Sequence, residues 1–193
     1  MQLPQQFPAN RPRRLRRDAY TRALVREHAL SAHDLIYPVF VLEGQGRREA
    51  VASMPGVERL SIDLLLPVIE ECVQLGIPYI APFPVISAHL KTEDGREAWN
   101  PDGLMPTFIR TVKQHFPEIG IMSDVALDPY TSHGHDGVMD GHEIVNDRTV
   151  ALLVGQALNQ ARAGADVIAP SDMMDGRIGA IRAGLDEEGF ESV

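Results

Sequence analysis

Four short apolar runs recur along the chain at intervals of about forty residues, and each is followed by a polar loop and a helical stretch. The runs span residues 35–42, 77–85, 119–127 and 165–172. Nearly continuous runs rich in Ile and Val are typical of parallel strands that are buried on both faces, and parallel strands need crossover helices between them. The sequence therefore predicts four consecutive βα units.

The helical stretches end at residues that stop a helix. Gly76 and Pro117 close the first two, Gly164 is expected to cap the third, and the last spans about 176–188. Four such units make half of an eightfold (β/α) barrel, and a closed barrel needs more chain than 193 residues. Half a barrel leaves strand edges unpaired and its apolar interior exposed. An open four-stranded α/β sheet is the alternative, although no Gly-rich phosphate motif opens any of the helices.

The first 32 residues differ in charge from the rest of the chain. Residues 1–30 carry a net charge of +5, so the remainder must carry −14 to reach the net −9 of the whole. We therefore expect a basic N-terminal arm over residues 1–32 and a barrel domain over 33–193. Clustered Arg could bind nucleic acid, but the acidic body would repel a polyanion and no aromatic platform accompanies it. Docking of the arm onto another subunit is the better interpretation.

Few features indicate an extracellular or membrane protein. No run of eighteen apolar residues occurs and no secretory signal opens the chain, so we expect a cytoplasmic protein without a membrane partner. The single cysteine, Cys72, excludes a disulfide framework, and its helical spacing with apolar neighbours predicts a buried thiol.

The stretch DVALDPYTSHGHDG, residues 124–137, gathers most of the reactive side chains at the end of the third run. In parallel α/β folds, functional residues lie where strands end, and Ser171 ends the fourth run in the same way. Clustered carboxylates repel unless a cation lies among them, and oxygen ligands suit Mg²⁺ better than zinc. The candidates of this stretch are Asp124, Asp128, His133, His135 and Asp136.

Lysine is scarce, with Lys91 and Lys113 against sixteen Arg. Lys113 lies on the polar side of a predicted helix, where we expect it to be solvated. Lys91 lies on a polar loop after the second run and could face a pocket mouth. An imine-forming lysine must be desolvated, and neither residue is a good candidate.

Several motifs carry a resemblance to a known family. The segments RPRRLRRDAYTRALVREHALSAHDLIYPVFVLEG, SMPGVERLSID, SDVALDPYTSHGHDG and APSDMMDGRIGAIR closely resemble porphobilinogen synthase, also called 5-aminolevulinate dehydratase. The resemblance implies a cytoplasmic hydro-lyase of tetrapyrrole and haem biosynthesis that condenses two molecules of 5-aminolevulinate to porphobilinogen, losing two waters. It also implies a (β/α)₈ barrel and a homo-octamer assembled through the N-terminal arm.

The resemblance also implies roles for individual residues. Zinc-dependent members carry three cysteines at the positions of Ala126, Asp128 and Asp136, so this chain resembles the zinc-independent subgroup that uses Mg²⁺ or a monovalent cation. Asp128 and Asp136 are then the candidate metal ligands. Asp124 matches the catalytic aspartate beside the substrates, and Ser171 matches a serine that lines the first substrate's pocket.

The sequence departs from the family pattern after the fourth unit. Members attach substrate through lysines on the fifth and sixth strands, in motifs resembling Ser-Ala-Lys and Val-Lys-Pro-Gly, and neither motif occurs here. We therefore expect no dehydratase activity from the 193-residue chain alone. Two alternatives remain: a metal-dependent barrel hydrolase using Asp128, His133 and His135, or a truncated, non-catalytic subunit that joins longer partners through its arm.

Overall fold

The computed structural model describes residues 6–193 and divides the chain into two units, one ending at Ser31 and one spanning Ala32–Val193. Residues 1–5 of the predicted arm lie outside the described residues. The first unit contains the 3-10 turn η1 (Pro12–Arg16) and the short helix α1 (Ala19–Leu24). Asp18 caps α1, because its carboxylate accepts a hydrogen bond from the backbone N–H of Thr21 at 2.9 Å.

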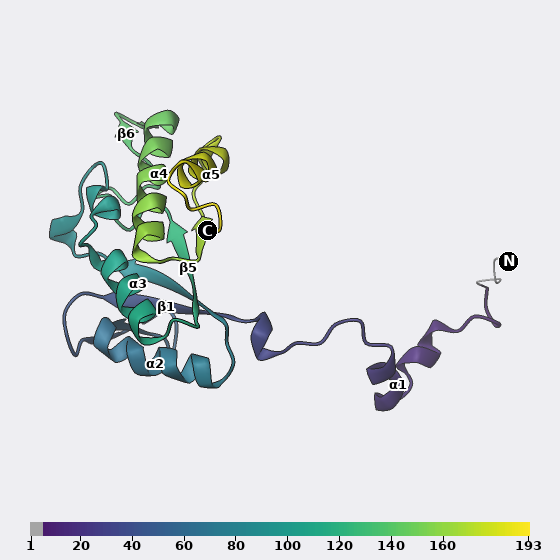
Figure 1. Ribbon diagram of the computed structural model, residues 1–193. Helices are drawn as coiled ribbons and strands as arrows, with labels where there is room; N and C mark the ends of the chain where they lie inside the picture. The colour runs from purple at the N-terminus through teal and green to yellow at the C-terminus, as the bar shows by residue number, and fades with distance from the viewer. Residues whose placement is uncertain (1–5) are drawn as a thin grey trace. The chain divides into compact units, whose positions relative to one another are not determined.

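The second unit consists of four βα units, as the apolar runs predict (Figure 1). Its four main strands lie side by side in chain order and all are parallel. None of the helices in residues 6–193 is long and apolar enough to cross a bilayer. In order, the elements are β1 (Ile36–Leu42), α2 (Ile62–Gln74), β4 (Tyr79–Val85), α3 (Leu104–His115), β5 (Gly120–Val125), α4 (Asn146–Ala163), β8 (Val167–Pro170) and α5 (Arg177–Glu187).

Two short hairpins were not expected from the sequence. β2 (Arg48–Ala50) pairs with β3 (Glu58–Ser61), and β3 runs parallel to the last residues of β1. β6 (Met139–Asp140) pairs with β7 (Glu143–Ile144) in the loop after β5. These strands are too short and too rich in charge to show an apolar pattern. β3 matters for the site, because it carries Arg59 to the end of β1.

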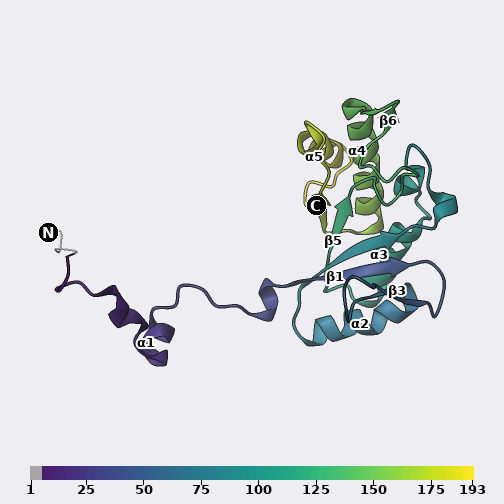
Figure 2. The ribbon, with the colours of Figure 1, turned by 180° about the vertical axis from the view of Figure 1, so that it is seen from behind.

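The helices cover one face of the strands. Seen from behind in Figure 2, β1 lies in front of α3 and β5 lies in front of α4. Val39 and Val41 of β1 point into the core on this side, together with Ile121 of β5 and Phe108 of α3. Phe40, between the two valines, is only partly buried and lies on the opposite face, which remains open as a half barrel requires.

The strands β4 and β5 separate soon after they begin. Within residues 79–85 and 120–125, they pair only through Tyr79 with Gly120 and Ile80 with Ile121. The loops that follow the two strands meet again farther on, where Thr92 forms a parallel bridge with Thr131. In this bridge the N–H of Thr92 donates to the carbonyl of Tyr130 at 3.2 Å and the N–H of Ser132 donates to the carbonyl of Thr92 at 2.9 Å. The chain therefore encloses a window between the two strands.

Side-chain amides of α4 replace the missing β4 partners along this window. The carbonyl of Val125 accepts from the N–H of Ser171 at 3.3 Å, so the carbonyls of Asp124 and Ala126, which alternate with it, face the β4 side. Gln160 donates to the carbonyl of Asp124 at 2.9 Å, and Gln156 donates to that of Ala126 at 3.2 Å. Both glutamines are buried. They hold the end of β5 in place without a neighbouring strand.

The burial of Cys72 agrees with the sequence-based prediction, whereas the environment of Lys113 does not. Cys72 is buried in α2, with 4% of its surface exposed, as predicted. The expectation of a solvated Lys113 is wrong, because its ammonium lies 2.6 Å from Asp166 and donates to the carbonyl of Ile119 at 2.8 Å. Asp166 also accepts from the N–H of Ile121 at 2.7 Å. Together they fasten α3 to the start of β5 and β8.

Replacing Gln160 by Met should destabilise the fold by about 1–3 kcal/mol, because the buried carbonyl of Asp124 would lose its partner. The matched control is Gln114→Met, at an exposed position of α3, which should change the free energy of unfolding by less than about 0.5 kcal/mol. Urea unfolding followed by circular dichroism measures both. Equal stability of the two variants would show that the amide does not support the window.

Candidate active site

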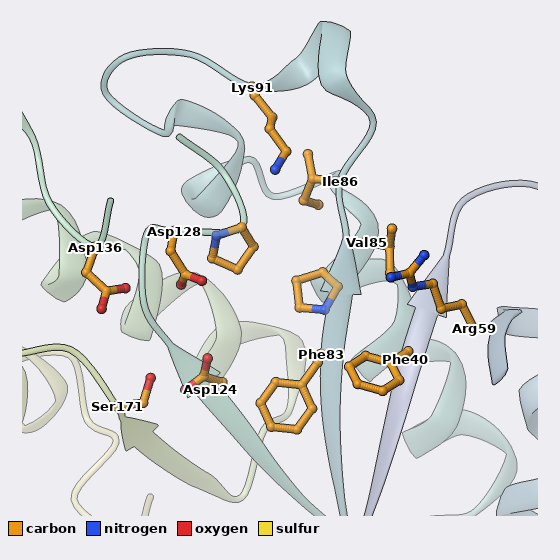
Figure 3. Close-up of a pocket in the computed structure, with 12 residues that line it drawn as sticks. Phe40, Arg59, Phe83, Val85, Ile86, Lys91, Asp124, Asp128, Asp136 and Ser171 are labelled. Atoms are coloured by element: carbon orange, nitrogen blue, oxygen red, sulfur yellow. The ribbon is translucent and has the colours of Figure 1, made fainter. Parts of the chain in front are cut away.

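A hollow of about 540 Å³ lies at the carboxyl ends of the strands, on the open face of the sheet (Figure 3). It reaches from β1 to the end of β8 and includes the window between β4 and β5. Parallel α/β folds place their functional groups at this end of the strands. Twelve residues line it: Phe40, Arg59, Phe83, Pro84, Val85, Ile86, Lys91, Asp124, Asp128, Pro129, Asp136 and Ser171.

The lining is divided by chemistry. Figure 3 shows three carboxylates, from β5 and the loop after it, on one side of the hollow, and an apolar strip from β1 and β4 beside them. Phe40 and Phe83, on adjacent strands, have ring centroids 6.1 Å apart in this strip. Lys91 and Arg59 supply the two positive charges. In Figure 3 Arg59 lies across the strip from the carboxylates, whereas Lys91 reaches from its loop to a place between Ile86 and Asp128. The pocket therefore has an acidic side and a basic border.

Asp124 and Ser171, two of the residues singled out in the sequence, both line this pocket. Asp124 belongs to β5, and Ser171 follows β8, the strand paired with it. Burial raises the pKa of the Asp124 carboxyl, and the nearby charges of Asp136 and Asp172 raise it further. The hydroxyl of Ser171, which donates to the carboxylate, opposes this pKa shift. A carboxyl group whose pKa is raised by its surroundings in a pocket is a candidate for proton transfer.

Asp128 and Asp136 also come together, although eight residues separate them in the sequence. Part of Asp128 is exposed, but burial of its carboxyl, followed by the contact with Asp136, raises the pKa of Asp128 to about 6. The charge of Asp124 adds to this effect. Atom Oδ1 of Asp136 is buried and has no hydrogen-bond partner. Two carboxylates with an unpartnered oxygen leave room for a positively charged group.

The third position at which zinc-dependent relatives are expected to carry cysteine does not reach the pocket. Ala126 is buried, with 3% of its surface exposed, and is not among the lining residues. Within residues 6–193, no group of three or more Asp, Glu, His or Cys side chains is arranged to hold a metal ion. Asp128 and Asp136 could hold one only as a pair, with water completing the shell.

The ring of His133, one of the two histidines of the loop, binds the backbone. His133 accepts a hydrogen bond at Nδ1 from the N–H of His135 at 3.2 Å, and its Nε2 lies 3.1 Å from the carbonyl of Glu93. Both ring nitrogens of His133 are therefore occupied by the backbone. Neither histidine lines the pocket that contains Asp128. The structure does not bring together the three residues of the hydrolase alternative.

Sequence reasoning missed part of the lining. It considered Lys91 only as a possible pocket-mouth residue, and it did not identify Arg59, Phe40 or Phe83. The two phenylalanines alternate with buried residues of their strands, a period-two signal that was hidden inside continuous apolar runs. No sequence pattern identified Arg59, because its position in the pocket depends on the pairing of β3 with β1.

Comparison with known proteins agrees with the motifs. The family model for delta-aminolevulinic acid dehydratase matches residues 9–193. The delta-aminolevulinic acid dehydratase of Bradyrhizobium diazoefficiens is 54% identical over 96% of this chain and 52% of its own length. The enzyme of Halalkalibacterium halodurans is 47% identical over 99% of this chain and 58% of its own.

A solved structure extends the likeness to the fold. The delta-aminolevulinic acid dehydratase of Toxoplasma gondii, in complex with the reaction product porphobilinogen, is 46% identical with a TM-score of 0.92. The comparison covers 99% of this chain and 54% of that one. The chain thus spans about half the length of the relatives it matches and has the fold of the corresponding part of a (β/α) barrel. It belongs to the delta-aminolevulinic acid dehydratase family.

Proposed function

We propose that this chain supplies the acidic half of an active site that condenses two molecules of 5-aminolevulinate to porphobilinogen, with loss of two waters. The observation that supports this proposal most directly is the convergence of Asp124, Asp128, Asp136 and Ser171 in one pocket. 5-Aminolevulinate carries an amine at one end, a carboxylate at the other and a ketone between them. The carboxylates on one side of the pocket suit the amine, and the cations Arg59 and Lys91 at its border suit the carboxylate.

Asp124 is the residue we assign to proton transfer. Its carboxyl lies between the end of β5 and Ser171, and burial raises its pKa, which favours a proton-holding role. Ser171 donates to it and fixes its direction. The backbone of Asp124 is held by Gln160, so the carboxyl is supported at both ends. A general acid or base placed in this way serves the two dehydration steps.

The chain itself offers no suitable lysine for an imine. The ammonium of Lys113 is bound by Asp166 and a backbone carbonyl, away from the pocket. Lys91 lies at the pocket border and is only partly buried, whereas an imine-forming lysine must be desolvated. We therefore assign imine formation to the part of the relatives that this chain does not span, with this chain holding the amine end of the substrate.

A cation between Asp128 and Asp136 would complete the acidic side. The unpartnered buried oxygen of Asp136 and the all-oxygen donor set fit Mg²⁺ or a monovalent ion, which take one or two carboxylates and several waters. When bound, such an ion would neutralise the two carboxylates and orient the substrate amine or a water molecule. Without thiolates, the pair is a poor zinc site.

The arm is proposed to bind a second copy of the chain within a cytoplasmic homo-octamer. In residues 6–31 the structure leaves large apolar side chains in solvent, with Tyr20, Leu24 and Leu30 exposed by 72%, 86% and 82%. Exposed apolar groups on a short segment favour a protein partner. The arm is also basic and the body acidic, so that docking of one on the other is favourable.

The main proposal can be tested by mixing this chain with the separately expressed remaining half of the Bradyrhizobium diazoefficiens relative. The co-eluting complex should form porphobilinogen from 5-aminolevulinate, and borohydride should trap an imine on the added half alone, as intact mass spectrometry would show. Asp124→Asn should lower the rate about a hundredfold or more. Asp102→Asn, at an exposed position outside the pocket, should not. An inactive complex, or equal rates for both variants, would contradict the proposal.

The Asp128 pair should make stability depend on pH in metal-free buffer. Because the pKa of Asp128 is about 6 in the folded chain and 3.8 for an unperturbed aspartate, the folded state retains a proton that the unfolded state releases between these limits. The free energy of unfolding should therefore fall as the pH rises from about 4 to about 6. Asp128→Asn should reduce this fall and be more stable than wild type above pH 6. Urea titrations at several pH values measure the difference.

Added Mg²⁺ provides the control for the same pair. It should restore stability to the wild-type chain at neutral pH but not to Asp128→Asn, which retains a single carboxylate of the pair. Wild type and variant with the same pH dependence would show that the two carboxyls do not interact. An equal response of both to Mg²⁺ would place the ion elsewhere.

Removal of residues 1–31 should reduce the assembly to fewer subunits, because the exposed apolar side chains of the arm would no longer reach a partner. Size-exclusion chromatography with light scattering measures the subunit number. Replacing Arg13 by Gln, a single exposed charge of the arm, is the control and should leave the assembly intact. An unchanged mass for the deletion variant would dismiss the role of the arm.

A further inference from the structure

A second hollow of about 470 Å³ lies beside the pocket, and it has a different character. We call it the polar groove. Its lining comes from the loop after β4, the loop after β5 and the first turn of α4. Three positive side chains face it, Lys91, Arg96 and Arg148, together with the hydroxyl-bearing residues Thr92 and Ser132.

The charges of the polar groove are unevenly matched. Asp94 accepts from the hydroxyl of Thr92 at 2.7 Å and lies 3.4 Å from Arg96, so these two charges compensate each other. Neither Lys91 nor Arg148 has an ion pair or a side-chain hydrogen bond within residues 6–193. Glu93 also lines the groove, but it is exposed to solvent. The three cations of the groove outnumber its two carboxylates by one charge, and the two cations without an ion pair are left to bind an anion.

The polar groove adjoins the pocket through one residue. Lys91 lines both hollows, and it directly precedes Thr92, whose backbone bridge to Thr131 joins the two loops. Ser132, next to this bridge, lines the groove, whereas Asp128 and Pro129, before it, line the pocket. In Figure 3 the side chain of Lys91 extends from its loop toward the pocket. An anion in the groove would thus lie close to the entrance of the pocket.

A positively charged entrance would help a substrate that carries a carboxylate to approach this acidic pocket. The chain has a net charge of −9, and the pocket contains three carboxylates. Both features repel the carboxylate end of an amino acid that approaches from solvent. Cations without ion pairs beside the pocket oppose this repulsion, and an arginine fork can bind a carboxylate with two parallel hydrogen bonds.

From these observations we infer that the polar groove is a carboxylate-capture site, in which Arg148 and Lys91 hold the carboxylate of a small amino-keto acid before its amine enters the acidic side of the pocket. This inference rests on the proposed function and adds the place and the residues of substrate entry. Arg148 acts as a positioning residue and takes no part in the chemical steps. A phosphate would satisfy the same two cations, so the test separates the two anions.

The probe is levulinate, which keeps the ketone and carboxylate of the substrate and lacks the amine. Titrated into the full chain and followed by ¹H–¹⁵N NMR, it should first shift the amides of Thr92 and Ser132, before those of Asp124 and Ser171. Arg148→Gln should weaken levulinate binding about tenfold, the loss expected for one charge-assisted contact. Arg148→Lys should recover part of the affinity, and Arg13→Gln, which removes the same charge from the arm, should change nothing.

Three further results decide the inference. The uncharged methyl ester of levulinate should not bind, and inorganic phosphate should bind more weakly than levulinate. Equal binding of the ester, tighter binding of phosphate, no binding of levulinate to wild type, or an unaffected Arg148→Gln variant would each overturn it. Asp124→Asn should weaken binding of 5-aminolevulinate and leave levulinate unaffected. A loss of 5-aminolevulinate binding with Asp124→Asn but not with Arg148→Gln would preserve the proposed function and reject the groove.

Discussion

The separation of β4 from β5 is the constraint on which the candidate site depends. Two parallel strands that stayed paired to their ends would fill the space between them with ladder hydrogen bonds. Here the pairing ends at Ile80 and Ile121, and Asp124 stands on a strand whose β4-facing carbonyls have no strand partner. Unsatisfied buried carbonyls are costly, and the amides of Gln156 and Gln160 remove that cost. The pocket exists because a helix completes the hydrogen bonding of a strand.

The same arrangement explains why acidic groups can accumulate in the pocket. Burial, followed by the charges of the neighbouring carboxylates, raises the pKa values of Asp124 and Asp128, so proton uptake relieves part of the cost of holding three carboxylates in one hollow. A substrate amine or a metal ion would relieve it further. The repulsion between these carboxylates is unfavourable in the empty pocket, so removing it contributes to the free energy of binding a cation.

Much of the fold could be predicted from the sequence, because local residue patterns identify most of the strands and helices. Continuous apolar runs identified β1, β4, β5 and β8, and Gly or Pro marked the helix ends. Asp124, Asp128, Asp136 and Ser171 were predicted because they follow strand ends and because their motifs resemble a known family, and the structure places all four in one pocket.

The remaining features depend on contacts between distant segments. Lys113 was expected in solvent because its helix looks amphipathic, yet Asp166 reaches it from the start of another strand. Arg59 reaches the pocket on a strand too short to show a pattern, and Arg148 reaches the polar groove from the first turn of α4. Side chains of this kind have no local signature, since their neighbours are decided by how the loops fold over the sheet.

The bridge between Thr92 and Thr131 is made by backbone groups alone. Such a tie does not depend on which side chains its residues carry, so mutation can alter the loop sequences and leave the frame of the pocket in place. The side chains inside that frame, such as those at 128 and 136, can then change without rebuilding the architecture.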